Sequence, residues 1–158
     1  MNSILYLGAD RLLLSRLLAP PLPRQPARES SSQSILLACL GDAVRDRADL
    51  AIVLNSWLVA DYGYCTLRRL MPLELAQKTI GATMRGNRAH RRSYSTQRKV
   101  DLLRSDIARR NPQRVTIIDG DPMTIPFEYI ERSITVGTAS SNNLDNFQSA
   151  LQQLLDFD

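Results

Sequence analysis

The sequence predicts an α+β fold, with helices first, then a small antiparallel β-sheet formed by a hairpin, and a C-terminal amphipathic helix. Three observations lead to this prediction. Apolar residues recur at helical spacing through residues 34–60 and 96–110. The pattern then changes to a β-branched run over residues 115–118, which an Asp-Gly dipeptide follows as a hairpin signal. A last apolar stripe at helical spacing covers residues 144–155.

The chain begins with segments that are predicted to lie outside the main domain. Residues 3–7 are typical of a short strand, and Asp10 is a suitable N-cap for a helix after it. Four prolines and four serines then crowd residues 20–34, a composition typical of a linker. The sequence therefore predicts an N-terminal arm over residues 1–19, a linker, and a single α+β domain over residues 35–158.

Helices are predicted for the first half of that domain. Residues 34–60 form one long helix or two shorter ones, because Gly41 and a polar stretch after it interrupt the apolar face. Residues 61–64 are typical of a turn. Pro72 is predicted to start a short helix, and residues 86–97 to form a polar loop.

The second half contains the predicted sheet. A helix over residues 96–110 is expected to stop at Pro112. The hairpin then pairs a strand at 115–118 with a returning strand at 123–130. Residues 133–136 are a third strand or the continuation of the second.

Composition excludes several classes of protein. The chain has 158 residues, 44% of them hydrophobic and 23% charged, which is typical of a globular domain. Two cysteines and one histidine exclude a disulfide framework and the usual zinc sets. No apolar stretch approaches the roughly 20 residues that a membrane span needs. We expect a cytoplasmic protein without a cofactor or a metal.

Residues for catalysis are scarce. His90 lies in a basic stretch, where neighbouring arginines disfavour the imidazolium, and a surface histidine is expected. The carboxylates at Asp119 and Asp121 are explained by a hairpin turn without an ion. No Walker loop and no Gly-x-Gly-x-x-Gly motif occurs. The sequence therefore predicts that the chain is not an enzyme.

Basic residues are concentrated in residues 85–114, which carry ten basic and two acidic side chains. Arginine pairs both phosphates and carboxylates through its planar fork. Two kinds of partner fit this bias: nucleic acid, or an acidic surface on a protein. Only Tyr94 places an aromatic ring within the polar loop, so a base-stacking platform is poorly supplied.

A series of motifs resembles a known family. Asp49 to Asn55 is similar to the Asp-Leu-x-x-Leu-Leu-Asn helix end of the lysozyme-like baseplate family of contractile tails, which includes the TssE-type wedge subunit of type VI secretion systems. The turn at Tyr62-Gly63 and the x-Pro-x-Arg pattern at Pro112 and Arg114 follow in the same order. The segments 115–117 and 127–129 resemble the two β-strands of that family.

The resemblance implies an assembly role. Such a chain is a structural subunit of a contractile injection baseplate, contacting other wedge proteins and the base of the sheath within a hetero-oligomer. The residues carried over as candidates for the partner interface are Asp49, Leu50, Leu54, Asn55, Tyr62, Gly63, Pro112, Arg114, Phe127 and Tyr129. The alternative is a small nucleic-acid-binding protein that uses the 85–114 stretch. A cell-wall hydrolase is the third hypothesis, for which no glutamate stands out as a buried acid.

Overall fold

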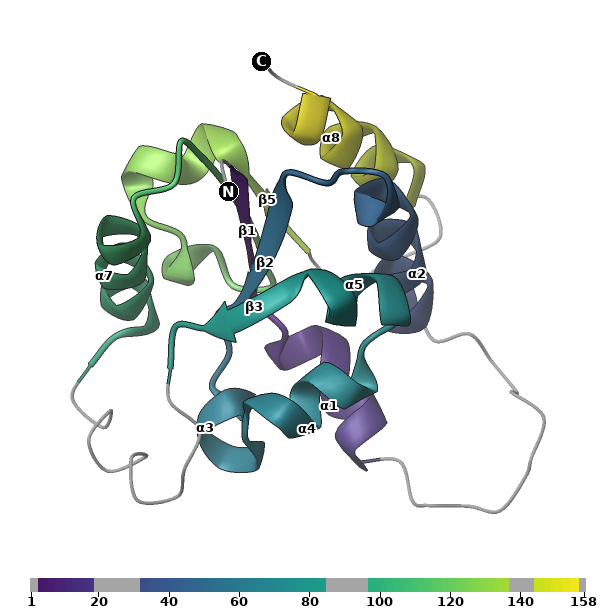
Figure 1. Cartoon of the computed structure of the whole chain (residues 1–158), viewed down its shortest axis with the longest axis horizontal. Helices are drawn as coiled ribbons and strands as arrows, with labels where there is room; N and C mark the ends of the chain where they lie inside the picture. Colours follow the sequence, from purple (N-terminus) through teal and green to yellow (C-terminus); the bar gives the residue numbers. More distant parts are fainter. Residues whose placement is uncertain (1–2, 19–31, 85–96, 137–143, 157–158) are drawn as a thin grey trace.

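The computed structural model describes residues 3–18, 32–84, 97–136 and 144–156, which form an α/β fold around a five-stranded sheet (Figure 1). The strand order is β3-β2-β1-β4-β5, and every neighbouring pair is parallel. The strands are β1 (Ser3–Leu7), β2 (Leu50–Leu54), β3 (Thr79–Ala82), β4 (Arg114–Asp119) and β5 (Ser133–Thr135). The prediction of an α+β fold with an antiparallel sheet is therefore wrong.

Helices cover both faces of the sheet, with α2, α5 and α8 on one side and α7 on the other (Figure 1). The helices are α1 (Asp10–Leu18), α2 (Ser32–Arg45), α3 (Leu58–Tyr62), α4 (Tyr64–Leu70), α5 (Leu73–Lys78), α7 (Lys99–Arg110) and α8 (Leu144–Asp156). Two 3₁₀ helices, η2 (Pro122–Thr124) and η3 (Phe127–Arg132), connect β4 to β5. The core accordingly falls into two clusters, one on each face.

Strand β1, which was expected in a separate arm, is the central strand of the sheet. Leu5 pairs with Ile52 of β2 on one side and with Thr116 of β4 on the other. All five residues of β1 are buried, because helices cover both of its faces. The linker predicted for residues 20–34 lies mostly outside the described residues.

The long helix predicted over residues 34–60 is divided in the structure. Helix α2 ends at Arg45, and residues 50–54 form the buried strand β2. A strand buried on both faces is apolar at every position, so its sequence does not alternate. Such a short run cannot be distinguished from a buried helix by periodicity alone, and this explains the error.

The predicted hairpin at Asp119-Gly120 does not form. After β4 the chain returns through η2 and η3 and enters β5 parallel to β4. Pro122 and Pro126 start these turns, and a proline has no N–H to donate to a ladder. The segment 123–130 was therefore predicted wrongly as a strand.

Two helix predictions in the second half are confirmed. Helix α7 ends at Arg110, and Asn111 takes the left-handed conformation before Pro112. In α8 the predicted stripe is buried at Phe147, Leu151 and Leu155 and packs on the first core cluster.

Candidate functional site

Polar side chains gather at the carboxyl edge of the sheet, where the parallel strands end. From β1 the chain first adds β2 and then β3 on one side of β1. It then returns to the other side of β1 to add β4 and β5. The order of the strands therefore reverses between β1 and β4, which makes this place the topological switch point of the sheet. The polar residues that follow or end the strands there are Asp10, Asn55, Ser56, Thr83 and Asp119.

Lys99 joins the two carboxylates of this edge. Its Nζ lies 2.6 Å from Asp10 Oδ2 and 2.8 Å from Asp119 Oδ2. The side chains of Lys99 and Asp119 are only 5% and 4% exposed. Lys99 is the first residue of α7, and the helix dipole disfavours a cation at that end. The two carboxylates offset this cost and that of burying the ammonium.

Asp10 is also hydrogen-bonded to the segment after β2. The Ser56 hydroxyl donates to Asp10 Oδ1 at 2.8 Å, and the backbone N–H of Leu58 reaches the same oxygen at 3.4 Å. Asp10 is the first residue of α1, so it connects the start of that helix with the start of α3. One carboxylate thereby positions three chain segments around Lys99.

Asp119 occupies space that Gly8 leaves open. A Cβ built on Gly8 would overlap the Asp119 carboxyl group, so the close approach of the two strand ends requires glycine. Oδ1 accepts the backbone N–H of Asp121 at 3.2 Å. Oδ2 is close enough to Lys99 for an ion pair, but the geometry is not that of a hydrogen bond. We regard the contact as electrostatic, which leaves a buried carboxylate oxygen with an unused hydrogen-bonding capacity.

Asn55 is a second buried polar side chain with an unused hydrogen-bonding group. It is fully buried after β2, and its Oδ1 accepts the Thr83 hydroxyl at 2.9 Å. Its Nδ2 finds no acceptor among the described residues. Asn55 belongs to the same edge, because its backbone N–H donates to the carbonyl of Leu7, the last residue of β1.

The candidate interface residues taken from the resemblance lie apart in the structure. Leu50 and Leu54 are core residues of β2, and Asn55 is buried at the carboxyl edge. By contrast, Tyr62 is exposed, and Phe127 is 84% exposed.

The other five candidates also occupy different places. Asp49 is exposed before β2, and Gly63 separates α3 from α4 with a φ of 85°. Pro112 and Arg114 are half-buried at the start of β4, and Tyr129 packs on the second core cluster. The structure therefore brings the ten residues into no single site.

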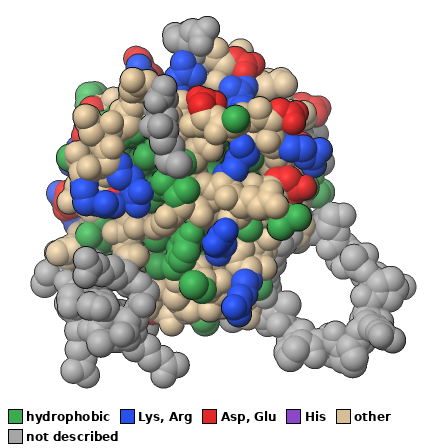
Figure 2. All heavy atoms as spheres, viewed as in Figure 1, with side chains coloured by type: hydrophobic (Ala, Val, Ile, Leu, Met, Phe, Trp, Pro, Cys, Tyr) green, Lys and Arg blue, Asp and Glu red, His purple; other side chains and the backbone are tan. Residues whose placement is uncertain are grey.

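The basic stretch is only partly described, since residues 85–96, including His90, lie outside the described ranges. Within the described part, Arg98 pairs with Asp101, Arg104 with Glu128, and both Arg109 and Arg110 pair with Asp106. Lysine and arginine side chains lie at separate places on the face shown in Figure 2, several of them beside acidic ones. The four arginines of α7 and its N-cap that are named above therefore form intramolecular pairs.

A hydrogen bond between two side chains links the central strand β1 to α7. The Tyr6 hydroxyl donates to Asp106 Oδ2 at 3.2 Å. Burial, and then the negative charge of Asp106, raise the pKa of Tyr6 above its usual range. Tyr6 is fully buried, so we assign this contact to holding α7 on the sheet rather than to chemistry.

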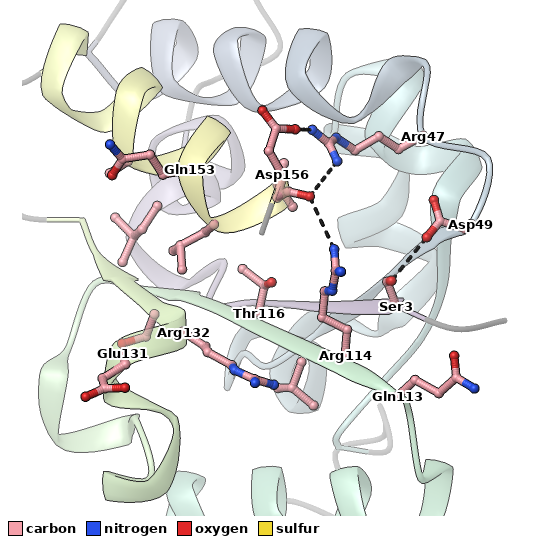
Figure 3. A pocket seen from close by; sticks show the side chains of 16 residues that line it. Ser3, Arg47, Asp49, Gln113, Arg114, Thr116, Glu131, Arg132, Gln153 and Asp156 are labelled. Atoms are coloured by element: carbon pink, nitrogen blue, oxygen red, sulfur yellow. Dashed lines mark hydrogen bonds and ion pairs between the residues drawn. The ribbon is translucent and has the colours of Figure 1, made fainter. Parts of the chain in front are cut away.

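A cavity of about 1140 Å³ lies at the opposite, amino edge of the sheet, beside α8 (Figure 3). Arg47 and Arg114 approach the end of α8 from two sides, and both donate to the carbonyl of Leu155. Arg47 also pairs with Asp156. Cations at a helix C-terminus satisfy its free carbonyls and complement its dipole. These arginines therefore have a structural explanation, and the convergence of buried charges favours the carboxyl edge as the site.

Sequence reasoning missed Asp10, Ser56, Lys99 and Asp119 as a group. The available signal covers three of the four: a polar residue follows each continuous apolar run within three positions, once those runs are taken as parallel strands. Nothing comparable marks Lys99, which begins α7. No group of three or more His, Cys, Asp or Glu side chains that could hold a metal ion occurs among the residues described. In the same part of the chain, no helix is long and apolar enough to cross a membrane.

Comparison with known proteins adds no identification: no protein-family model, curated protein or solved structure matches this chain.

Proposed function

We propose that this chain binds a small phosphate-bearing molecule together with Mg²⁺ at the carboxyl edge of β1 and β4. The observation that carries the proposal is the meeting of Asp10 and Asp119 on the single ammonium of Lys99. In open parallel sheets, small ligands bind outside the carboxyl ends of the strands at the switch point. The cluster lies at that point.

The charge of the cluster favours a cation. Without the exposed side chain of Arg11, the two carboxylates and one ammonium leave one negative charge at a largely buried position. In phosphate-binding sites, Mg²⁺ is usually held by one or two carboxylates together with water and phosphate oxygens. Oδ2 of Asp119 accepts no hydrogen bond among the described residues, so its lone pairs would be available to a metal that replaced the Lys99 ammonium, which lies 2.8 Å away.

The surrounding groups suit the phosphate. Lysine binds phosphate as a point charge, so Lys99 is suited to move from the carboxylates to the ligand when Mg²⁺ takes its place. Helix α1 begins at the edge with Asp10, and a helix N-terminus favours anions. The proposal concerns binding and includes no covalent step.

Thermal unfolding tests the proposal directly. We expect MgCl₂ and inorganic phosphate together to raise Tm by about 5–10 °C at a hundredfold excess over Kd, because ligand binding to the folded state then adds about 2.7 kcal/mol. Each component alone is expected to give a smaller shift, since neither completes the site.

Two carboxylate variants provide the control. Asp119→Asn removes a proposed metal ligand and is expected to abolish the combined shift. Asp46→Asn makes the same change at an exposed position before β2, at the amino edge, and should retain the shift. Unchanged Tm of the wild-type protein with both components present would exclude the proposal.

Binding of a partner protein is a second candidate function, because one of the candidate interface residues taken from the resemblance is highly exposed. Phe127 is 84% and Met123 is 82% exposed, and large exposed apolar groups are typical of interaction surfaces. The wedge-subunit role and the cytoplasmic location stay predictions. Of the segments that supported the resemblance, the expected helix end is strand β2, and the expected hairpin is replaced by a connection that begins with the 3₁₀ helix η2. Comparing the proteins that co-purify with the wild-type chain and with a Phe127→Ser variant tests this candidate function.

A further inference from the structure

We infer that the ligand of the carboxyl edge contains a diphosphate group, and that Arg11 is the residue that selects it over a single phosphate. The inference rests on the proposed function and names the class of ligand for that site. It follows from the position of Arg11 beside the site, from the lack of a partner for its guanidinium among the described residues, and from the geometry of a diphosphate.

Arg11 lies beside both carboxylates of the site. It follows Asp10 in the first turn of α1, and its side chain crosses Gly120, which follows Asp119. A Cβ built on Gly120 would be 2.7 Å from Arg11 Cδ and 3.3 Å from Arg11 Nε. The absence of a side chain at position 120 therefore makes room for Arg11 at the edge of the cluster.

The guanidinium of Arg11 has no partner in the part of the chain that the structure describes. Its side chain is exposed, whereas the arginines of α7 pair with carboxylates. Asp10 and Asp119 are both occupied by Lys99. Arg11 is thus held next to the site as a cation that the described residues do not neutralise.

A diphosphate suits this arrangement better than a single phosphate. Mg²⁺ bridges oxygens of two adjacent phosphoryl groups in many nucleotide sites, so a cation on Asp10 and Asp119 would orient both groups. Lys99 then contacts one phosphoryl group, and the planar fork of Arg11 is free to bind two oxygens of the other. A single phosphate would leave Arg11 without a partner.

The experiment measures binding by calorimetry in the presence of Mg²⁺, with orthophosphate, pyrophosphate and ADP as ligands. We expect the wild-type chain to bind pyrophosphate about tenfold more tightly than orthophosphate, as one charge-assisted contact predicts. In Arg11→Gln we expect the ratio of the two affinities to fall close to one. Arg11→Lys should restore only part of it, because an ammonium lacks the fork.

Arg45→Gln is the matched control. Arg45 is an exposed arginine at the end of α2 that pairs with Asp42, so its loss should leave the ratio unchanged. ADP binding as tight as that of pyrophosphate identifies the diphosphate of a nucleotide, and weaker ADP binding identifies inorganic pyrophosphate. Both results support the inference.

The two proposals fail in different ways. Equal affinity of the wild-type chain for orthophosphate and pyrophosphate, or an equal loss of both affinities in Arg11→Gln, overturns the role of Arg11 and leaves the proposed function standing. If the wild-type chain binds none of the three ligands with Mg²⁺, the proposed function is overturned and this inference with it.

Discussion

At the scale of single residues, two glycines set the geometry of the candidate site. Gly8 leaves the space that the Asp119 carboxyl group fills, and Gly120 leaves the space that the Arg11 side chain crosses. A side chain at either position would displace a charged group. The ion pairs of Lys99 depend on the first of these spaces, because Asp119 is one of the two carboxylates with which the almost fully buried ammonium pairs in this structure.

Gly8→Ala is therefore expected to destabilise the protein. The new Cβ pushes the Asp119 carboxyl group away from Lys99, and overpacking of this kind costs about 1–3 kcal/mol. The free energy of unfolding in urea measures the effect. The same variant should also lose the stabilisation by MgCl₂ and phosphate.

Gly41→Ala is the control for the glycine change itself. Gly41 lies inside α2, and a Cβ there would meet its nearest atoms at 3.8 Å, an ordinary contact distance. Alanine is a better helix former, so we expect a gain of about 0.5–1 kcal/mol. A neutral or stabilising Gly8→Ala would contradict the steric role assigned to Gly8.

At the scale of elements, α7 is tied to the sheet and to the connection between β4 and β5. It begins with Lys99 at the site, and Asp106 contacts Tyr6 of β1. Arg104 forms two hydrogen bonds with Glu128 of η3, at 2.8 and 2.9 Å. Each contact fixes α7 against a different segment.

The pair of Arg104 and Glu128 predicts a pH dependence. The hydrogen bonds from Arg104 lower the pKa of Glu128 to about 2 from its usual 4.5. A group with a lowered folded-state pKa stabilises the fold above the unfolded value, so this contribution is present above pH 4.5 and is lost as the pH falls toward 2. The pair is exposed, and its contribution to stability is small.

NMR titration of the Glu128 side-chain carboxyl measures this effect. We expect a midpoint near 2 in the wild-type protein and a return toward 4.5 in Arg104→Gln. Arg98→Gln changes an arginine of the same region that pairs with Asp101, so the Glu128 midpoint should stay low. An unperturbed midpoint in the wild-type protein would show that the pair does not form.

At the scale of the whole molecule, the fold leaves several large apolar side chains of one connection exposed. Met123, Phe127 and Ile130 lie in or beside the two 3₁₀ helices that return the chain from β4 to β5. The core on that face is completed by Ile125 and Tyr129 instead. The exposed side chains are therefore not required to close the fold and are available to a partner.

We expect Phe127→Ser to reduce retention of a partner protein in a pull-down from the native host after nuclease treatment and a high-salt wash. Truncation of an aromatic side chain that is a hot spot of an interface costs about 2 kcal/mol or more, whereas most interface residues cost less than about 1 kcal/mol. The stability of the isolated chain should change by less than about 0.5 kcal/mol, because the residue is exposed. Equal retention of the same proteins by both chains would contradict a role for Phe127.

The sequence predicted individual elements better than their arrangement. The strand at residues 3–7 and the helices at α7 and α8 were expected from periodicity, caps and the stop at Pro112. Residues 50–54 were assigned to a helix, and Asp119-Gly120 to a hairpin. Both errors concern strands or turns whose partners lie far away in the chain.

The candidate site could not be predicted for the same reason. Asp10, Lys99 and Asp119 are distant in the sequence, and no motif links them. Their meeting depends on the parallel order of β1 and β4, which brings carboxyl ends to one edge. Asp119 was noticed only as part of a turn.

By itself, the sequence determined where the chain is apolar, where helices are capped and where prolines interrupt them, because these properties depend on neighbouring residues. Only the tertiary structure decided that the three apolar runs at 3–7, 50–54 and 115–118 are neighbouring parallel strands. Burial on both faces removes the alternation that would identify them locally. Strand order is set by packing across the whole domain, and with it the place where the charges of the site converge.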